Sequence, residues 1–188
     1  MNCYDFDKTI YYHDSTKRFY KFLLKKYPKM ALRGPAQFIA FLKYRTGIWS
    51  KTQMKEVVYS AFRYVPDIKT EVELFWKDEI KNIKKWYLDQ QKADDLIISA
   101  SPYFLLEPIC TKLGITELLA SEVDEKTGKY TGLNCYGEEK VERLKKHTGN
   151  TKMDEFYSDS LSDSPLAELA DASFLVDWDK ITPWPDKQ

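Results

Sequence analysis

The first ten residues contain two carboxylates two positions apart and a hydroxyl two positions further on, Asp5, Asp7 and Thr9, directly after a short apolar segment. On extended backbone, side chains two positions apart point to the same side, about 6 to 7 Å from one another. Two acids placed in this way at the end of a strand could share a divalent cation and a phosphoryl group, with one attacking and the other donating a proton. Taken alone, the spacing favours an acidic turn after an edge strand, so its interpretation depends on the rest of the chain.

Length and composition predict a compact folded protein. The chain has 188 residues, of which 43% are hydrophobic and 15% aromatic, and this suits one domain or a core with an inserted subdomain. No segment approaches the roughly 18 uninterrupted apolar residues of a membrane span. The acidic motif begins so early that no room is left for a signal peptide, and we expect a cytoplasmic location. The three cysteines lack paired spacing, which favours neither a disulfide framework nor a zinc site.

The zero net charge hides a division of the chain. Residues 11–93 contain 18 Lys and Arg against 8 Asp and Glu, a net charge of +10, and the remainder carries −10. Most of these charges are typical of solvated helix surface, but a basic insertion beside metal-binding carboxylates could also attract an anionic substrate. No motif that reads nucleic acid is present, and no nucleic-acid partner is expected.

Apolar periodicity predicts a helical middle between strands. A strand is expected at 2–6, and the polar residues at 13–16 offer N-cap side chains for a helix. Further helices are predicted at about 35–46, 51–63 and 67–91. After residue 93, segments with the pattern of strands alternate with segments with the pattern of helices. Strands are expected at 94–99, 155–157 and 174–176, a hairpin at 121–133, and helices at 102–113, 137–147 and 164–169.

This alternation predicts an open parallel α/β sheet. In such sheets, ligands bind beyond the carboxyl ends of the strands. Asp5, Ser99 and Asp159 all fall at the predicted ends of strands. We therefore expect three distant segments to converge on one site.

Four segments, in this order and context, resemble the motifs of haloacid dehalogenase-like hydrolases. They are the Asp5-x-Asp7-x-Thr9 segment, the apolar run ending in Ser99, Lys140 in the first turn of a helix, and residues 159–163 after a short strand. The chain is most similar to the phosphoserine phosphatase-like branch, in which a helical cap of the C1 type lies between the first two motifs. The resemblance implies a Rossmann-like parallel sheet flanked by helices, formed by residues 1–10 and 94–188, and a helical cap at 11–93.

The resemblance also implies two-step phosphoryl transfer through an aspartyl phosphate. Asp5 would be the nucleophile and a ligand of Mg²⁺, and Asp7 the general acid and base, with its backbone carbonyl on the metal. Asp159 would be a direct metal ligand, while Asp163 would bind the metal or orient its waters, which suits the oxygen ligands that Mg²⁺ prefers.

Ser99 and Lys140 are implied as the phosphate-binding residues. A lysine in the first turn of a helix opposes the helix dipole, so a phosphate and a carboxylate nearby would compensate for its position. Lys145 and Lys146 lie on the same predicted helix and leave the identity of the motif lysine open. Two departures from the family pattern are Lys8, where glycine is commonest, and Ser162, where many relatives have asparagine.

Substrate choice is expected to lie with the cap. Its candidates for gripping a carboxylate or second phosphate are the arginines, because a guanidinium gives a bidentate fit: Arg18, Arg33, Arg45 and Arg63. Phosphoserine phosphatases also use a cap glutamate, and residues 11–55 contain none, which disfavours phosphoserine as the substrate.

The favoured function is a Mg²⁺-dependent phosphomonoesterase that acts on a small phosphorylated metabolite. One alternative is a phosphatase acting on a phosphorylated lipid head group at a membrane surface. Another is a relative without catalysis that binds phosphorylated ligands or a protein partner. The complete set of acidic motifs favours an enzyme, since adjacent carboxylates repel one another unless a cation is present.

Overall fold

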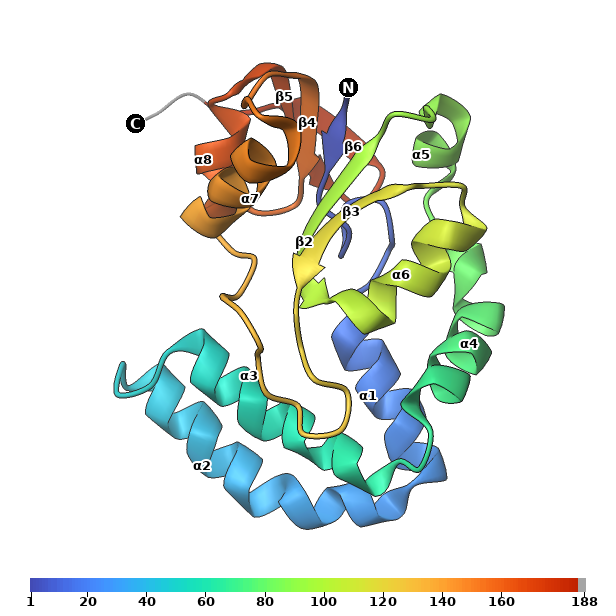
Figure 1. Ribbon diagram of the computed structural model, residues 1–188, viewed down its shortest axis with the longest axis vertical. Helices are drawn as coiled ribbons and strands as arrows, with labels where there is room; N and C mark the ends of the chain where they lie inside the picture. Colours follow the sequence, from blue (N-terminus) through green and yellow to red (C-terminus); the bar gives the residue numbers. More distant parts are fainter. Residues whose placement is uncertain (186–188) are drawn as a thin grey trace.

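A six-stranded sheet forms the centre of the molecule, whose computed structural model describes residues 1–185. Its order is β3-β2-β1-β4-β5-β6, with β1 to β5 parallel and β6 antiparallel to β5 (Figure 1). The strands are β1 (Cys3–Tyr4), β2 (Leu96–Pro102), β3 (Glu117–Ser121), β4 (Met153–Ser158), β5 (Ala170–Asp177) and β6 (Lys180–Pro183). The predicted α/β class with a mostly parallel sheet is confirmed.

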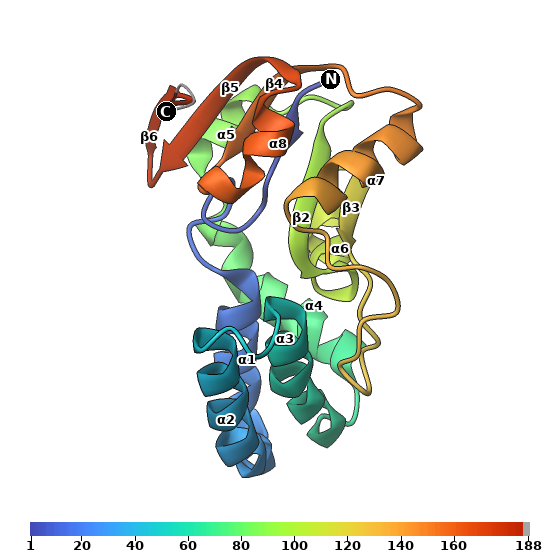
Figure 2. The ribbon, with the colours of Figure 1, turned by 90° about the vertical axis from the view of Figure 1, so that its left-hand side faces the viewer.

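Helices lie on both faces of the sheet and beyond one of its ends. They are α1 (Ser15–Lys26), α2 (Gly34–Arg45), α3 (Lys51–Tyr59), α4 (Ile68–Glu79), α5 (Lys85–Gln90), α6 (Tyr103–Lys112), α7 (Glu138–Thr148) and α8 (Ser164–Ala167). Figure 2 shows α1, α2 and α3 projecting together beyond the end of the sheet. None of the helices in the described part of the chain is long and apolar enough to cross a membrane.

Alternating side chains of the central strands build two separate cores. Tyr4, Ile97 and Tyr157 belong to a large cluster with residues of α4, α5 and α6. Their neighbours along each strand, including Cys3 and Phe156, belong to a second cluster with α7 and α8. Each fully buried large side chain stabilises the fold by about 1.5 to 3 kcal/mol. A slip of one residue would exchange the two faces, so burial fixes the register of the short strand β1 and the position of the residues after it.

The structure corrects the expectation of one helix over 67–91. Helix α4 ends at Glu79, a short 3-10 turn follows, and Ile83 takes extended backbone before α5 begins. Ile83 forms an antiparallel bridge with Tyr11, and the Lys84 N–H donates to the Ile10 carbonyl at 2.8 Å. Hydrogen bonds to the segment after β1 therefore override a continuous helical pattern.

Two edge strands were not predicted. Strand β3 occupies 117–121, where no strand was expected, and β6 pairs with β5 although it ends in Pro183. Edge strands carry weak apolar alternation, and a proline is tolerated there because one side lacks a partner. The hairpin expected at 121–133 is present in a short form. Val123 and Tyr130 form an antiparallel bridge, the Asp124 N–H donates to the Lys129 carbonyl, and the Thr131 N–H donates to the Glu122 carbonyl.

The loop at 122–136 reaches from the sheet to helix α3, as both ribbon views show (Figures 1 and 2). The Tyr130 N–H donates to Glu56 Oε1 at 3.0 Å, and the rings of Tyr130 and Tyr59 lie 6.2 Å apart. Gly128 has a φ of +73°, and a Cβ atom there would lie 2.4 Å from the backbone of Tyr59. Glycine is therefore required at this contact for two reasons, its backbone conformation and the lack of space.

We expect Gly128→Ala to destabilise the protein by about 3 kcal/mol, because overpacking adds to the cost of a left-handed alanine. Gly114→Ala is the matched control, since Gly114 has the same φ of +73° and no atom within 4 Å of the added Cβ. The control should lose only about 1 kcal/mol. Urea unfolding measures both, and equal losses would show that the contact with α3 has no energetic weight.

Candidate active site

The Asp5–Asp7 segment turns sharply between β1 and α1. The Asp5 N–H donates to the Tyr157 carbonyl at 2.9 Å, which continues the pairing of β1 with β4. Lys8 then takes a φ of +60°, and its N–H donates to the His13 carbonyl at 3.0 Å. A left-handed residue at this point explains why glycine is favoured in the family pattern. The turn is completed without glycine here, at a cost in backbone strain.

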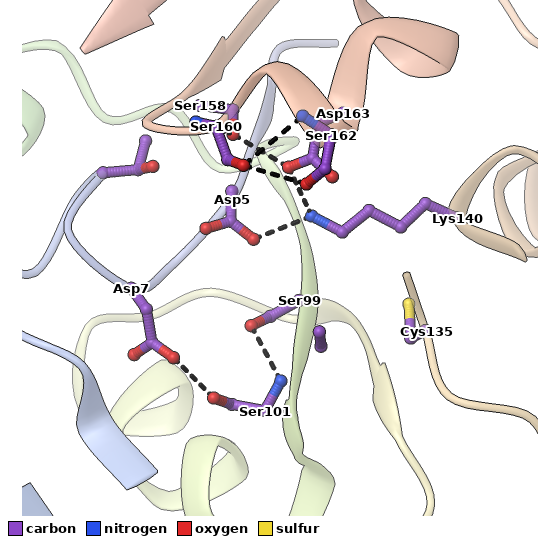
Figure 3. Close-up of polar contacts among 12 residues, drawn as sticks. Asp5, Asp7, Ser99, Ser101, Cys135, Lys140, Ser158, Ser160, Ser162 and Asp163 are labelled. Carbon is purple, nitrogen blue, oxygen red and sulfur yellow. Dashed lines mark hydrogen bonds and ion pairs between the residues drawn. The ribbon is translucent and has the colours of Figure 1, made fainter. Parts of the chain in front are cut away.

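Asp5, Lys140 and Asp163 form a buried charged cluster (Figure 3). Lys140 Nζ lies 2.8 Å from Asp5 Oδ1 and 2.7 Å from Asp163 Oδ2. The Ser158 hydroxyl also donates to Asp163 Oδ2, at 2.8 Å. Lys140 of the third predicted motif thus contacts both Asp5 of the first motif and Asp163 of the fourth. Lys146 of the same helix is exposed.

One ammonium cannot neutralise two buried carboxylates. Burial raises the pKa of Asp5 to about 7, against the attraction of Lys140, and the charge of Asp163 adds to the increase. Burial lowers the pKa of Lys140, but Asp5 and Asp163 outweigh this effect and raise it above its usual value. The cluster therefore holds a charged lysine, and Asp5 takes up a proton more readily than an ordinary carboxylate.

Asp7 is held apart from this cluster by donors from two elements. The Ser101 hydroxyl donates to Asp7 Oδ2 at 2.5 Å, and the Ser15 N–H at the start of α1 donates to Asp7 Oδ1 at 2.8 Å. Burial raises the pKa of Asp7 to about 6, with a further increase from the charge of Asp14, although the bonds from Ser101 and Ser15 oppose it. A carboxyl with this pKa exchanges protons near neutral pH, as a general acid and base must.

Ser99 lies at an irregularity within β2 rather than at its end. The register with β3 shifts between Ser99 and Pro102, and the Ser101 N–H donates to Ser99 Oγ at 3.2 Å. Both serines are buried. The prediction that the strand stops at Ser99 is wrong by three residues, because the irregularity lets β2 continue while Ser101 contacts Asp7.

Asp159 lies just after β4, beside the first motif. Its N–H donates to Thr9 Oγ1 at 2.9 Å, and its Oδ2 lies 3.4 Å from Lys8 Nζ. Burial raises the pKa of Asp159, against the attraction of Lys8. Thr9, the last residue of the first motif, therefore helps to position Asp159 at the start of the fourth motif.

The oxygen donors at these strand ends fit a hard cation such as Mg²⁺. Asp5 and Asp159 follow adjacent paired strands, and no hydrogen bond within residues 1–185 engages Asp5 Oδ2. No group of three or more His, Cys, Asp or Glu side chains in the described range forms a ready metal site. Mg²⁺ does not need one, because it is usually bound through one or two carboxylates and keeps several waters.

Three of the four candidate arginines have polar contacts outside this cluster. Arg18 pairs with Glu79, the Arg33 Nε–H donates to the Ser60 hydroxyl, and the Arg63 Nε–H donates to the Ser60 carbonyl. Arg45 is exposed near the end of α2. The structure brings none of them into contact with Asp5, Asp7 or Lys140.

Lys55 is the basic residue of the helical segment that approaches the acidic pair. Its Nζ donates to the Ala100 carbonyl at 2.8 Å, next to Ser99 and Ser101. Burial lowers the pKa of Lys55 to about 8, and Lys51 adds to this, while Asp7, Asp14 and Asp5 attract the charge. The sequence carries no signal that separates Lys55 from the other lysines of residues 11–93, whereas Ser101 could have been found two positions after Ser99 in the same strand.

Comparison with known proteins decides the family. A family model described as haloacid dehalogenase-like hydrolase matches residues 3–168, a range that includes all four motifs. The chain belongs to this family. The resemblance of the sequence to this family is therefore confirmed.

Curated relatives match the haloacid dehalogenase-like chain over part of their length. The histidinol-phosphatase of Neisseria meningitidis is 31% identical over 103 residues, which cover 48% of this chain and 46% of that protein. The chain spans less than half the length of the curated relatives that it matches.

Solved structures of the haloacid dehalogenase-like fold match most of the chain. A protein of unknown function from Bordetella pertussis has a TM-score of 0.73 at 22% identity, with 92% of this chain and 87% of that one covered. A phosphoserine phosphohydrolase-like protein from Francisella tularensis has a TM-score of 0.57 at 16% identity, with 92% and 84% covered. At these identities the likeness concerns the fold alone.

Proposed function

We propose that the protein is a Mg²⁺-dependent phosphomonoesterase that hydrolyses a small phosphorylated metabolite through an aspartyl phosphate on Asp5. The observation that carries the proposal is the arrangement of Asp5 beside the buried ammonium of Lys140, with Asp7 held separately by Ser101 and Ser15. The two carboxylates thus have different surroundings, which suit a nucleophile and an acid. Phosphatase names among the curated relatives support the same reaction.

In the first step, a carboxylate oxygen of Asp5 attacks phosphorus and the bond to the leaving oxygen breaks. Asp7 gives its proton to that oxygen, so that an alcohol leaves. The pKa of about 6 keeps a fraction of Asp7 protonated at neutral pH. Lys140 donates to phosphate oxygens as charge develops on them, together with the Ser99 hydroxyl.

In the second step, Asp7 is ionised and takes a proton from water, whose oxygen attacks the phosphorus of the acyl phosphate. The bond to Asp5 breaks and inorganic phosphate forms, while the Asp5 carboxylate is restored. Asp7 returns its proton to solvent or keeps it for the next turnover. Ser101 and Ser15 hold the same carboxyl group in place for both roles.

Asp5, Asp159 and the backbone carbonyl of Asp7 would hold Mg²⁺, and Asp163 would orient its waters while it binds Lys140. The ion supplies charge neutralisation between an anionic nucleophile and an anionic phosphate. Residues 11–93 are proposed as the cap, from which Lys55 supplies a positive charge that attracts Asp7 and Asp5.

We expect the purified protein to hydrolyse p-nitrophenyl phosphate in the presence of Mg²⁺. Removal of divalent cations with EDTA should lower the rate at least about a hundredfold, because the ion contributes several kcal/mol to transition-state stabilisation. Mg²⁺ should also raise the midpoint of thermal unfolding, since it binds only the folded state. A rate that EDTA leaves unchanged would contradict the metal requirement, and no hydrolysis across a panel of phosphometabolites would favour a binding protein.

A further inference from the structure

A cavity of about 690 Å³ opens beside the proposed metal site, and the mechanism described above gives it no role. Lys8 and Asp159 lie on its wall, so one end borders residues 5–9, the catalytic loop of the proposed mechanism. Helix α1 forms a second wall, and the turn between β5 and β6 forms a third. Asp159 is a proposed metal ligand, so this end of the cavity adjoins the proposed metal site.

The wall formed by the β5–β6 turn presents a strained tryptophan. Trp178 occupies the first of the two residues that join Asp177 to Lys180, and its side chain is 66% exposed. Its φ is +54°, and within residues 1–185 only Lys8 is another non-glycine residue with positive φ. A bulky side chain in this conformation lowers stability, and such strain is found mainly at functional positions. Glycine would satisfy the turn, so the fold alone gives no reason for an indole here.

A single buried lysine links this tryptophan to the catalytic loop. Lys84 Nζ donates to the Lys8 carbonyl at 2.6 Å and to the Trp178 carbonyl. It also lies 5.3 Å from the ring centre of Tyr12, whose ring is 6.0 Å from that of Trp178. Lys84 therefore holds both left-handed residues, and it fixes the aromatic wall relative to the loop that carries Asp7.

The α1 wall of the cavity is basic. Lys17 pairs with Asp14, and Arg18 pairs with Glu79. Lys21 lies one turn further along the helix and forms no ion pair or hydrogen bond in the described part of the chain. Five basic side chains line the cavity against the three carboxylates of Asp14, Asp159 and Asp177, so the lining carries a net positive charge. Together with the aromatic surface, this charge suits a ligand that is both planar and anionic.

We propose that this cavity is the leaving-group subsite and that it takes a phosphomonoester whose leaving group carries a planar ring, stacked on Trp178. The inference rests on the proposed phosphatase function and names the class of its substrate. Trp178 selects the ring, Lys84 is the positioning residue that holds Trp178, and Lys21 attracts an anionic substituent of the leaving group.

Equilibrium binding to an Asp5→Asn variant tests the proposal without turnover. The probes are benzyl phosphate and cyclohexylmethyl phosphate, which have similar size and the same kind of alcohol but differ in planarity. With Trp178 present, the benzyl ester should bind about fivefold more tightly, the ratio expected for one aromatic contact. In the double variant with Trp178→Ala the ratio should fall to about one, and in a control with Trp49→Ala, which does not line the cavity, it should persist.

Trp178→Gly separates binding from folding. Because glycine adopts positive φ without strain, this variant should have an unfolding midpoint in urea at least as high as the wild type and should still lose the preference for the ring. An unchanged preference in either Trp178 variant would overturn the subsite. If the preference is present while no phosphate ester is hydrolysed, the proposed function fails and the subsite stands.

Discussion

Asp5→Asn should reduce phosphatase activity by about 10⁴-fold or more in kcat, because an amide cannot form the acyl phosphate. The same change should leave the free energy of unfolding at pH 8 equal to or above that of the wild type. The pKa of Asp5 is raised to about 7 in the folded protein. Above this pH, the ionised carboxylate is therefore less stable in the folded protein than in the unfolded chain. A group with a raised folded pKa loses stability as pH rises through that value, and asparagine removes the charge.

Asp78→Asn is the matched control, since Asp78 is exposed on α4 and should change neither property. The two variants are compared by p-nitrophenyl phosphate hydrolysis with Mg²⁺ and by urea unfolding at pH 8. Activity of Asp5→Asn within tenfold of the wild type would exclude Asp5 as the nucleophile. A large loss of stability at pH 8 would instead show that the ion pair with Lys140 outweighs the cost of the buried charge.

The parts of the site that could be predicted are those set by chain order in a parallel sheet. The carboxyl ends of β1, β2 and β4 lie at one edge of the sheet. Asp5 and Asp159, which follow recognisable apolar runs, could be expected at that edge, whereas Ser99 lies within β2, three residues before its end. Lys140 also lies where its place in the first turn of a helix indicated. Local pattern was sufficient for these residues because each is positioned by its own strand or helix.

The other contacts around the site could not be predicted, because the type of a residue does not show which distant residue it contacts. Arg18 was a candidate for binding substrate, and it lines the cavity proposed for the leaving group, but the sequence does not show that it pairs with Glu79, which is 61 residues away. Lys84 had no distinguishing feature, and yet it joins the catalytic loop to the β5–β6 turn. A buried ammonium and a solvated one carry the same letter in the sequence. Only the packing of segments that are distant in the chain separates them.

Lys140→Met should lower the rate of p-nitrophenyl phosphate hydrolysis by about 10² to 10³-fold, because it removes a charged donor from the developing phosphate charge. It should also destabilise the fold by about 3 to 5 kcal/mol at pH 8, since two buried carboxylates are left without their cation. Methionine nearly preserves the length and apolar packing of the stem, so the loss reports the ammonium.

The dependence of this loss on pH identifies its cause. Lys140 lowers the pKa of Asp5, so without it Asp5 takes up a proton in the folded state at a higher pH than in the wild type, and the variant regains stability as pH falls. The difference between variant and wild type should therefore shrink between pH 8 and pH 5.5, a window that includes the pKa of about 7 of Asp5. Lys146→Met, on the exposed side of the same helix, should show neither effect. A loss that is equal at both pH values would mean that Lys140 acts through packing, and it would remove the electrostatic basis for placing the phosphate beside Asp5.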